Sequence, residues 1–268
     1  RWVRCDMRLG AAVARNRGLD LARGRWIAFC DDDDLWAPDK LSAQLSALTA
    51  NPEARWSACG AVYVDRAGRL LHGDHPPEGN DVARDLLTHN TVPGGGSGVV
   101  ADARLLREVG RFDPSLTHAE DWDMWIRLAL ASPAVCVDRP LVAYLVHGGG
   151  KSFLLDGVDK PLALIMNKYS DEYLLRGVAV NLRQWDRWVA DQQCRAGMRL
   201  APAARCLHIA VREHDGRSLL AALGTLLAPG LVTTLKDRRA SAKIPVAWHA
   251  EVATWLASSA GDLQIDAI

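Results

Sequence analysis

RWIAFCDDDD, residues 25–34, is the stretch of sequence that decides the fold. Its first six residues are mostly apolar and are bounded by charge, a pattern that predicts a short strand over residues 25–30. Four consecutive aspartates, residues 31–34, follow directly, and Pro38 stands where a helix over residues 38–49 would begin. The acidic side chains are therefore expected in a loop at the C-terminal end of a strand, the edge where open α/β sheets bind ligands.

Strand and helix patterns alternate on both sides of this stretch. Strands are predicted over residues 2–7, 56–64, 69–72, 99–101, 135–137 and 141–146, and helices over residues 11–22, 81–88, 104–109 and 120–131. From about residue 156 onward the sequence shows helical patterns alone. It therefore predicts an α/β core in residues 1–155, followed by an α-helical C-terminal region in residues 156–268.

The composition limits which classes of protein this chain can belong to. A chain of 268 residues with 49% hydrophobic residues can bury one substantial core or two small ones. Its 32 basic and 32 acidic side chains balance, which argues against a nucleic-acid-binding protein, because phosphate contacts need a basic excess. The six cysteines are scattered without the spacing of a zinc site or a disulfide framework. A reducing, cytoplasmic setting is expected.

The C-terminal region holds one long uncharged segment, residues 218–235, which approaches the roughly 20 residues that span a bilayer. Pro229 and Gly230 interrupt it, so two short helices, packed on a domain or lying on a membrane surface, are favoured over a membrane span. A basic face for such contact could come from arginines that otherwise remain solvated, namely Arg176, Arg183, Arg187, Arg195 and Arg199.

Two acidic clusters are candidates for chemistry. Asp31 and Asp33 can converge on one divalent ion, and hard oxygen ligands favour Mg²⁺ or Mn²⁺ over zinc; the alternative is a solvated turn that caps the next helix. Glu120 and Asp121 open the helix predicted over residues 120–131. There they either complement the helix dipole or, in the case of Asp121, supply a general base to an acceptor hydroxyl.

HGGGKS, residues 147–152, follows a predicted strand. The GKS ending suggests a phosphate-binding P-loop, but that motif needs glycine at position 145, where Leu145 stands. A loop that carries His147 near a metal and Lys151 near a phosphate requires less special geometry.

Three groups of residues occur in an order that resembles glycosyltransferase family 2, the inverting enzymes with a GT-A fold. The resemblance covers about residues 1–155 and rests on ARNRGL (14–19), ARGRWIAF (22–29), DDDDLW (31–36) and PDKL (38–41), then on VGRFD (109–113), EDWD (120–123) and RL (127–128), and finally on His147 with Ser152. It implies an α/β, Rossmann-like GT-A core with the helical region behind it.

The resemblance also implies a function. The chain would be a metal-dependent inverting glycosyltransferase that moves a sugar from a nucleotide-diphosphate donor to a saccharide or lipid-linked acceptor in polysaccharide or glycan biosynthesis. On the donor side, the resemblance implies that Asp31 and Asp33 bind the donor and Mn²⁺ or Mg²⁺, that His147, later in the chain, contacts the metal or the diphosphate, and that Arg15 and Asn16 contact the nucleotide. On the acceptor side, it implies that Asp121 deprotonates the acceptor. The implied acceptor-binding residues are Glu120, Trp122, Gly96 and Ser97.

The sequence departs from the family pattern at its start, because it opens at what resembles the family's third strand. We therefore expect an N-terminally incomplete sheet whose apolar edges promote self-association. A peripheral position at the inner face of a membrane is expected if the acceptor is lipid-linked. Two alternatives remain open: a non-catalytic remnant that binds a nucleotide or sugar, and an ATPase built on the GGGKS loop.

Overall fold

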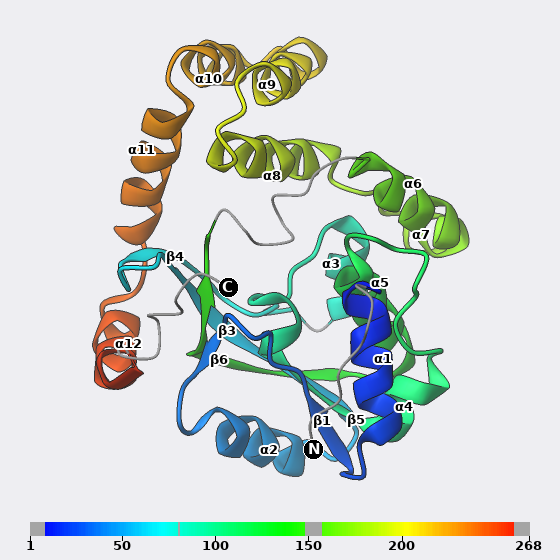
Figure 1. Cartoon of the computed structure of the whole chain (residues 1–268). Helices are drawn as coiled ribbons and strands as arrows, with labels where there is room; N and C mark the ends of the chain where they lie inside the picture. Colours follow the sequence, from blue (N-terminus) through cyan, green and yellow to red (C-terminus); the bar gives the residue numbers. More distant parts are fainter. Residues whose placement is uncertain (1–8, 80, 148–156, 260–268) are drawn as a thin grey trace.

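The computed structural model describes residues 9–79, 81–147 and 157–259. As predicted, they form a mixed α/β core that is followed in the chain by a helical region (Figure 1). The strand predicted over residues 2–7 lies outside the described residues. Six strands of the described part form one sheet: β1 (Trp26–Ala28), β2 (Leu35–Trp36), β3 (Trp56–Val64), β4 (Leu70–Asp74), β5 (Val99–Asp102) and β6 (Ala134–Leu145).

β3 is the central strand, in the order β1-β5-β3-β6-β2. It runs parallel to β6 and antiparallel to its other neighbours, and β1–β5 and β2–β6 are also antiparallel. β5 pairs with β3 over Trp56–Ala58, whereas β4 pairs with it over Ala61–Val64. β4 and β5 therefore share one edge of β3. The segment that connects β4 to β5 returns to the sheet at this edge, between the two paired parts of β3.

The helices of the core cover both faces of this sheet. They are α1 (Ala11–Leu21), α2 (Lys40–Ala50), α3 (Val82–Thr88), α4 (Ala103–Glu108) and α5 (Glu120–Ala131). Side chains alternate between the faces: Ile27 packs in the cluster with α1, α3, α4 and α5, while its neighbours Trp26 and Ala28 pack toward α2. This period of two is what the pleated backbone of a strand dictates.

The helical region arches over one end of the core and returns to it (Figure 1). Its helices are α6 (Asp159–Lys168), α7 (Ser170–Arg176), α8 (Leu182–Arg195), α9 (Leu200–Glu213), α10 (Gly216–Leu227), α11 (Pro229–Ser241) and α12 (Val246–Ser259). Both ends of the arch share a hydrophobic cluster with the core, α6 through Leu162 and Ile165, and α12 through Trp248 and Val252. The division at residues 155 and 156 stays a prediction.

Two short helices were predicted for residues 218–235, and the structure confirms this with α10 and α11, which break at Ala228. Among the described residues we find no helix with the length and apolar character needed to cross a bilayer.

The prediction of separate strands over residues 135–137 and 141–146 was wrong, because β6 is one strand. Cys59 pairs with Val137 and Gly60 pairs with Pro140, so Asp138 and Arg139 are extra residues on the β6 side of the ladder. A bulge of this kind accommodates Pro140, which has no N–H to donate to the neighbouring strand. In sequence, this irregularity within one strand has the same residue types as a break between two strands.

Gly60, which faces this bulge, has no room for a side chain. A Cβ atom there would lie 2.5 Å from the Trp248 ring of α12 and 2.8 Å from the Arg139 carbonyl oxygen. We expect Gly60→Ala to lower the free energy of unfolding by about 1–3 kcal/mol, the usual cost of overpacking.

Urea denaturation followed by circular dichroism measures this loss. Gly18→Ala in α1 is the matched control, since its added Cβ meets no atom within 4 Å and alanine favours a helix by roughly 0.5–1 kcal/mol over glycine. Equal stability of the two variants would contradict the tight contact.

Candidate functional site

Arg15 joins the two acidic clusters that the sequence analysis singled out. Its guanidinium group donates to both carboxylate oxygens of Asp31, at 2.8 and 3.1 Å, and to Glu120 Oε1 at 3.0 Å. The Arg15 side chain is only 12% exposed and that of Glu120 only 6%. The end of β1 and the start of α5, which are far apart in sequence, therefore meet at one cation supplied by α1.

A glycine-rich loop lies between these clusters. A Cβ atom at Gly96 would come within 2.9 Å of the Arg15 guanidinium, and one at Gly95 would lie 3.6 Å from Asp121 Oδ2. The absence of side chains at these positions lets Arg15 and Asp121 approach the backbone closely. Arg15, Asp31, Glu120 and Asp121 thus gather around the Gly95–Gly98 turn.

Ser97 ties the acidic loop to this turn. Its hydroxyl accepts a hydrogen bond from the Asp31 N–H at 3.0 Å and donates one to Asp34 Oδ2 at 2.5 Å. Asp34 also accepts from the Leu145 N–H of β6 at 3.2 Å. The last of the four aspartates therefore points inward and anchors the loop, whereas Asp31 and Asp33 remain about one-third exposed.

Burial and neighbouring charges shift two ionisable groups here. Burial raises the pKa of Asp34 to about 8, the charges of Asp31 and Asp33 act in the same direction, and the Ser97 hydrogen bond opposes them. Burial works against the charged form of Arg15, but Asp31, Glu120 and Asp121 outweigh it, so the pKa of Arg15 is raised. The site thus keeps a fixed positive charge among its carboxylates.

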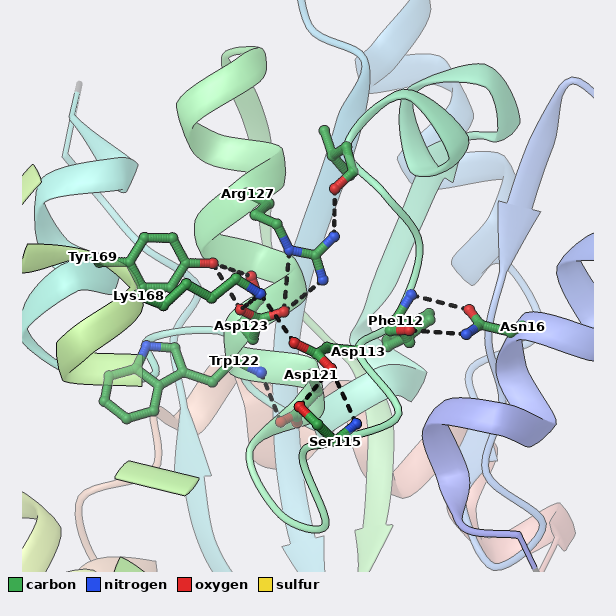
Figure 2. A network of polar contacts seen from close by, with 11 residues as sticks. Asn16, Phe112, Asp113, Ser115, Asp121, Trp122, Asp123, Arg127, Lys168 and Tyr169 are labelled. Atoms are coloured by element: carbon green, nitrogen blue, oxygen red, sulfur yellow. Dashed lines mark hydrogen bonds and ion pairs between the residues drawn. The ribbon is translucent and has the colours of Figure 1, made fainter. Parts of the chain in front are cut away.

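α5 places Asp121 at its N-terminal end, and a buried network holds this helix (Figure 2). Asp123 is fully buried and accepts from Arg127 at 2.5 Å, from the Tyr169 hydroxyl at 2.7 Å and from Lys168 Nζ at 2.7 Å. Arg127 also donates to the Val109 carbonyl oxygen at 2.6 Å. The carboxylate of Asp121, two residues away, accepts from the Trp122 N–H at 2.7 Å.

Asp33 and His147 form a second contact of the acidic loop. His147 Nε2 lies 2.8 Å from Asp33 Oδ2, and the His147 ring is 17% exposed. The contact is a hydrogen bond, and the same spacing would suit two adjacent ligands of one octahedral ion, because bonds of about 2.1 Å at right angles place ligand atoms about 3 Å apart. A divalent cation would need further oxygen atoms, from water or from a phosphate-bearing ligand.

The structure pairs two of the three predicted metal ligands and directs the third elsewhere, since both oxygens of Asp31 contact Arg15. Within the described residues, no group of three or more His, Cys, Asp and Glu side chains is placed to hold a metal ion. Residues 148–152 of the predicted His147–Ser152 loop lie outside the described part.

Two other predicted site residues have structural contacts. The side-chain amide of Asn16 donates to the Phe112 carbonyl oxygen at 2.8 Å and accepts from the Phe112 N–H at 2.9 Å, which fastens α1 to the segment before α5. Trp122 is 2% exposed and donates from its ring to the Leu86 carbonyl oxygen at 2.6 Å. Their predicted roles in binding donor and acceptor stay predictions.

Sequence reasoning missed the support behind the glycine-rich loop. Lys40 is fully buried, which lowers its pKa, and donates to Gln44 Oε1 at 2.7 Å. Gln44 in turn donates to the Gly98 carbonyl oxygen at 3.0 Å and contacts Ser57 of β3. The signal was the spacing of Lys40 and Gln44, four residues apart and hence on one face of α2.

Comparison with known proteins gives matches over most of the core. A family model described as glycosyltransferase like family 2 matches residues 4–177. The succinoglycan biosynthesis protein ExoO of Rhizobium meliloti is 29% identical over 247 residues, which cover 85% of this chain and 66% of ExoO. The putative teichuronic acid biosynthesis glycosyltransferase TuaG of Bacillus subtilis is 61% identical over 86 residues, 32% of this chain and 33% of TuaG.

A solved structure, that of residues 1–349 of TarS from S. aureus, is 16% identical, with a TM-score of 0.42 over 94% of this chain and 69% of that one. The chain spans between 12% and 66% of the length of several curated relatives that it matches.

The Arg15 bridge gives a stability test. We expect Arg15→Leu to lower the free energy of unfolding by about 3–5 kcal/mol, because it removes the largely buried guanidinium that pairs with both Glu120 and Asp31. Thermal and urea unfolding measure the loss. Arg69→Leu is the matched control: Arg69 also pairs with an aspartate but is 79% exposed, so its loss should stay below about 1 kcal/mol. Similar losses in the two variants would contradict the importance of the bridge.

Proposed function

The chain belongs to the family 2-like glycosyltransferases, and from this premise we propose that it transfers a sugar from a nucleotide-diphosphate donor to a hydroxyl group of an acceptor. The observation that supports the proposal best is the Arg15 bridge, which holds Asp31 at the end of β1 beside Glu120 at the start of α5. The acidic loop and Asp121 both lie against one glycine-rich turn, the first at Ser97 and the second at Gly95. Donor and acceptor could therefore meet there.

The donor side of the site comprises Asp31, Asp33 and His147. We assign Asp33 and His147 as protein ligands of a divalent cation, Mn²⁺ or Mg²⁺, because their 2.8 Å separation suits adjacent ligands on one ion. Such an ion, when bound, neutralises the negative charge that grows on the departing diphosphate. Asp31, fixed by Arg15 and by Ser97, borders the position of the nucleotide.

The acceptor side is formed by α5 and the turn. Asp121 has one carboxylate oxygen held by the Trp122 N–H and the other close to Gly95. In the proposed reaction the acceptor oxygen attacks the anomeric carbon, the bond from this carbon to the diphosphate oxygen breaks, and Asp121 takes the hydroxyl proton. A single displacement of this kind inverts the anomeric centre and needs no covalent intermediate on the protein.

The acceptor class is proposed from the relatives. ExoO is named for succinoglycan biosynthesis and TuaG, putatively, for teichuronic acid biosynthesis. Both names refer to polysaccharides, and the resemblance of this chain to both supports a saccharide acceptor, free or lipid-linked, in polysaccharide biosynthesis.

Asp121→Asn tests the base. We expect the rate of sugar transfer to fall about 10²–10⁴-fold, because asparagine cannot accept the hydroxyl proton, while binding of the nucleoside diphosphate is unchanged. Transfer is measured by nucleoside diphosphate release across a panel of nucleotide-sugars, and binding by calorimetry. Asp32→Asn is the matched control, since Asp32 is an exposed aspartate of the acidic loop with no assigned role. Full activity of Asp121→Asn would contradict the assignment.

Asp33→Ala tests the donor side separately. We expect nucleoside diphosphate binding to require Mn²⁺ or Mg²⁺, to be lost on chelation and to weaken in Asp33→Ala, because the variant removes one of two protein ligands. Metal-independent binding that Asp33→Ala leaves intact would overturn the metal assignment.

The two alternatives have their own outcomes in these measurements. Donor binding without transfer to any acceptor would favour a non-catalytic remnant of the fold. Metal-independent nucleotide binding that is lost in Lys151→Ala would favour an ATPase at the GGGKS loop, whose residues 148–152 lie outside the described part of the structure.

A further inference from the structure

α10 carries its large apolar side chains on the outside. Its inward positions are small or polar, Ser218, Ala222 and Thr225, and these three are buried. From residue 219 onward its exposed positions are all leucine and recur at helical spacing: Leu219, Leu220, Leu223, Leu226 and Leu227. A helix at the surface of a water-soluble domain shows the opposite arrangement, with its apolar stripe toward the core.

The neighbouring helices extend this apolar surface. α9, which packs along α10, exposes Leu200, Leu207 and Val211 opposite its buried Ile209. α11 exposes Leu231 and Leu235 opposite its buried Pro229 and Thr233. We call the outward side chains of α9, α10 and α11 the leucine surface. α9 and α10 lie in the middle of the arch, at its greatest distance from the sheet (Figure 1).

The charges around the leucine surface are unbalanced. Residues 182–241 contain ten basic and five acidic side chains, although the whole chain is neutral. Each of these five acids, Asp186, Asp191, Glu213, Asp215 and Asp237, is held in an ion pair by arginine or lysine. Within residues 182–241, all of which the structure describes, the exposed arginines without an ion pair are Arg199, Arg217, Arg238 and Arg239.

The arginines proposed from sequence for a basic face are mostly a different set. Arg176, Arg183, Arg187 and Arg195 are bound to carboxylates, and only Arg199 of the original five remains without one. The cations that border the leucines are instead Arg217, at the start of α10, and Arg238 and Arg239, one to two turns beyond Leu231 and Leu235 on α11.

We propose that the leucine surface docks on a membrane surface that contains anionic lipids. Exposed leucines with arginines beside them are the arrangement of a helix that lies in the interfacial plane of a bilayer, where leucines enter the acyl region and arginines reach the headgroups. The binding is peripheral. It does not depend on the proposed transfer reaction, and it would bring the chain to lipid-linked molecules.

Charge favours a lipid surface over a second copy of the chain. In a symmetric dimer the same patch meets itself, so the unpaired arginines would face one another. The acids of α8–α11 are all engaged within one molecule and offer no partner to those arginines. Anionic headgroups supply the missing negative charge.

Vesicle flotation tests the apolar part of the proposal. We expect the chain to float with vesicles of phosphatidylcholine and phosphatidylglycerol, and the triple variant Leu220→Glu, Leu223→Glu, Leu227→Glu to stay unbound. The matched control is Leu174→Glu, Leu175→Glu on α7, where the leucines are 82% and 79% exposed outside the leucine surface. Circular dichroism checks that each variant is folded. Equal loss of binding in both variants would overturn the location of the surface.

The charge part is tested with Arg217→Glu, Arg238→Glu, Arg239→Glu. We expect at least about a tenfold loss of binding to phosphatidylglycerol vesicles, an effect that salt reproduces for the unchanged chain. Arg23→Glu, Arg66→Glu reverses two exposed arginines elsewhere as a control. Equal binding to pure phosphatidylcholine would overturn the requirement for anionic lipid. A different result would show that a second copy of the chain covers the surface instead. In that case the unchanged chain would bind neither kind of vesicle, and its dimer would dissociate in the triple leucine variant.

Discussion

The interaction on which the candidate site depends is that of one largely buried guanidinium group with carboxylates from two distant segments. A charge removed from water must be paired, and Arg15 meets this requirement only when the end of β1 and the start of α5 are both in place. The position of the Arg15 guanidinium also explains the glycine at position 96, because any side chain there would occupy the space of this group. The contacts that assemble the candidate site are therefore also contacts that join distant segments of the core.

Much of the core could be predicted from sequence. The helix over residues 120–131 and the strand over residues 56–64 have the predicted bounds, because their periodicity and terminal residues agree. β2 was not predicted, since two residues give no periodicity. The bulge of β6 appeared as a break because charged residues and Pro140 are signals that a strand interior and a loop share.

The members of the candidate site stay predictions, and their contacts could not be predicted from sequence. A run of four aspartates does not reveal that the fourth turns inward to Ser97 while the first pairs with Arg15, because burial depends on segments elsewhere in the chain. The sequence likewise predicted two short helices in residues 218–235 without showing that the leucines of α10 face outward. The sequence therefore predicted the chemical groups, and packing determined which were anchors and which were left at the surface.

The sharing of one edge of β3 by β4 and β5 has a consequence for local stability. Between the two strands the backbone of the glycine-rich loop is bonded by side chains, with the Gly94 N–H donating to the Tyr63 hydroxyl and the Gly98 carbonyl accepting from Gln44. The loop can thus open by exchanging these bonds, and those of Ser97 with Asp31 and Asp34, for water while every strand pair persists. The amide protons of the loop should exchange with solvent through local fluctuations, whereas those of β3 should exchange only when a larger part of the core unfolds.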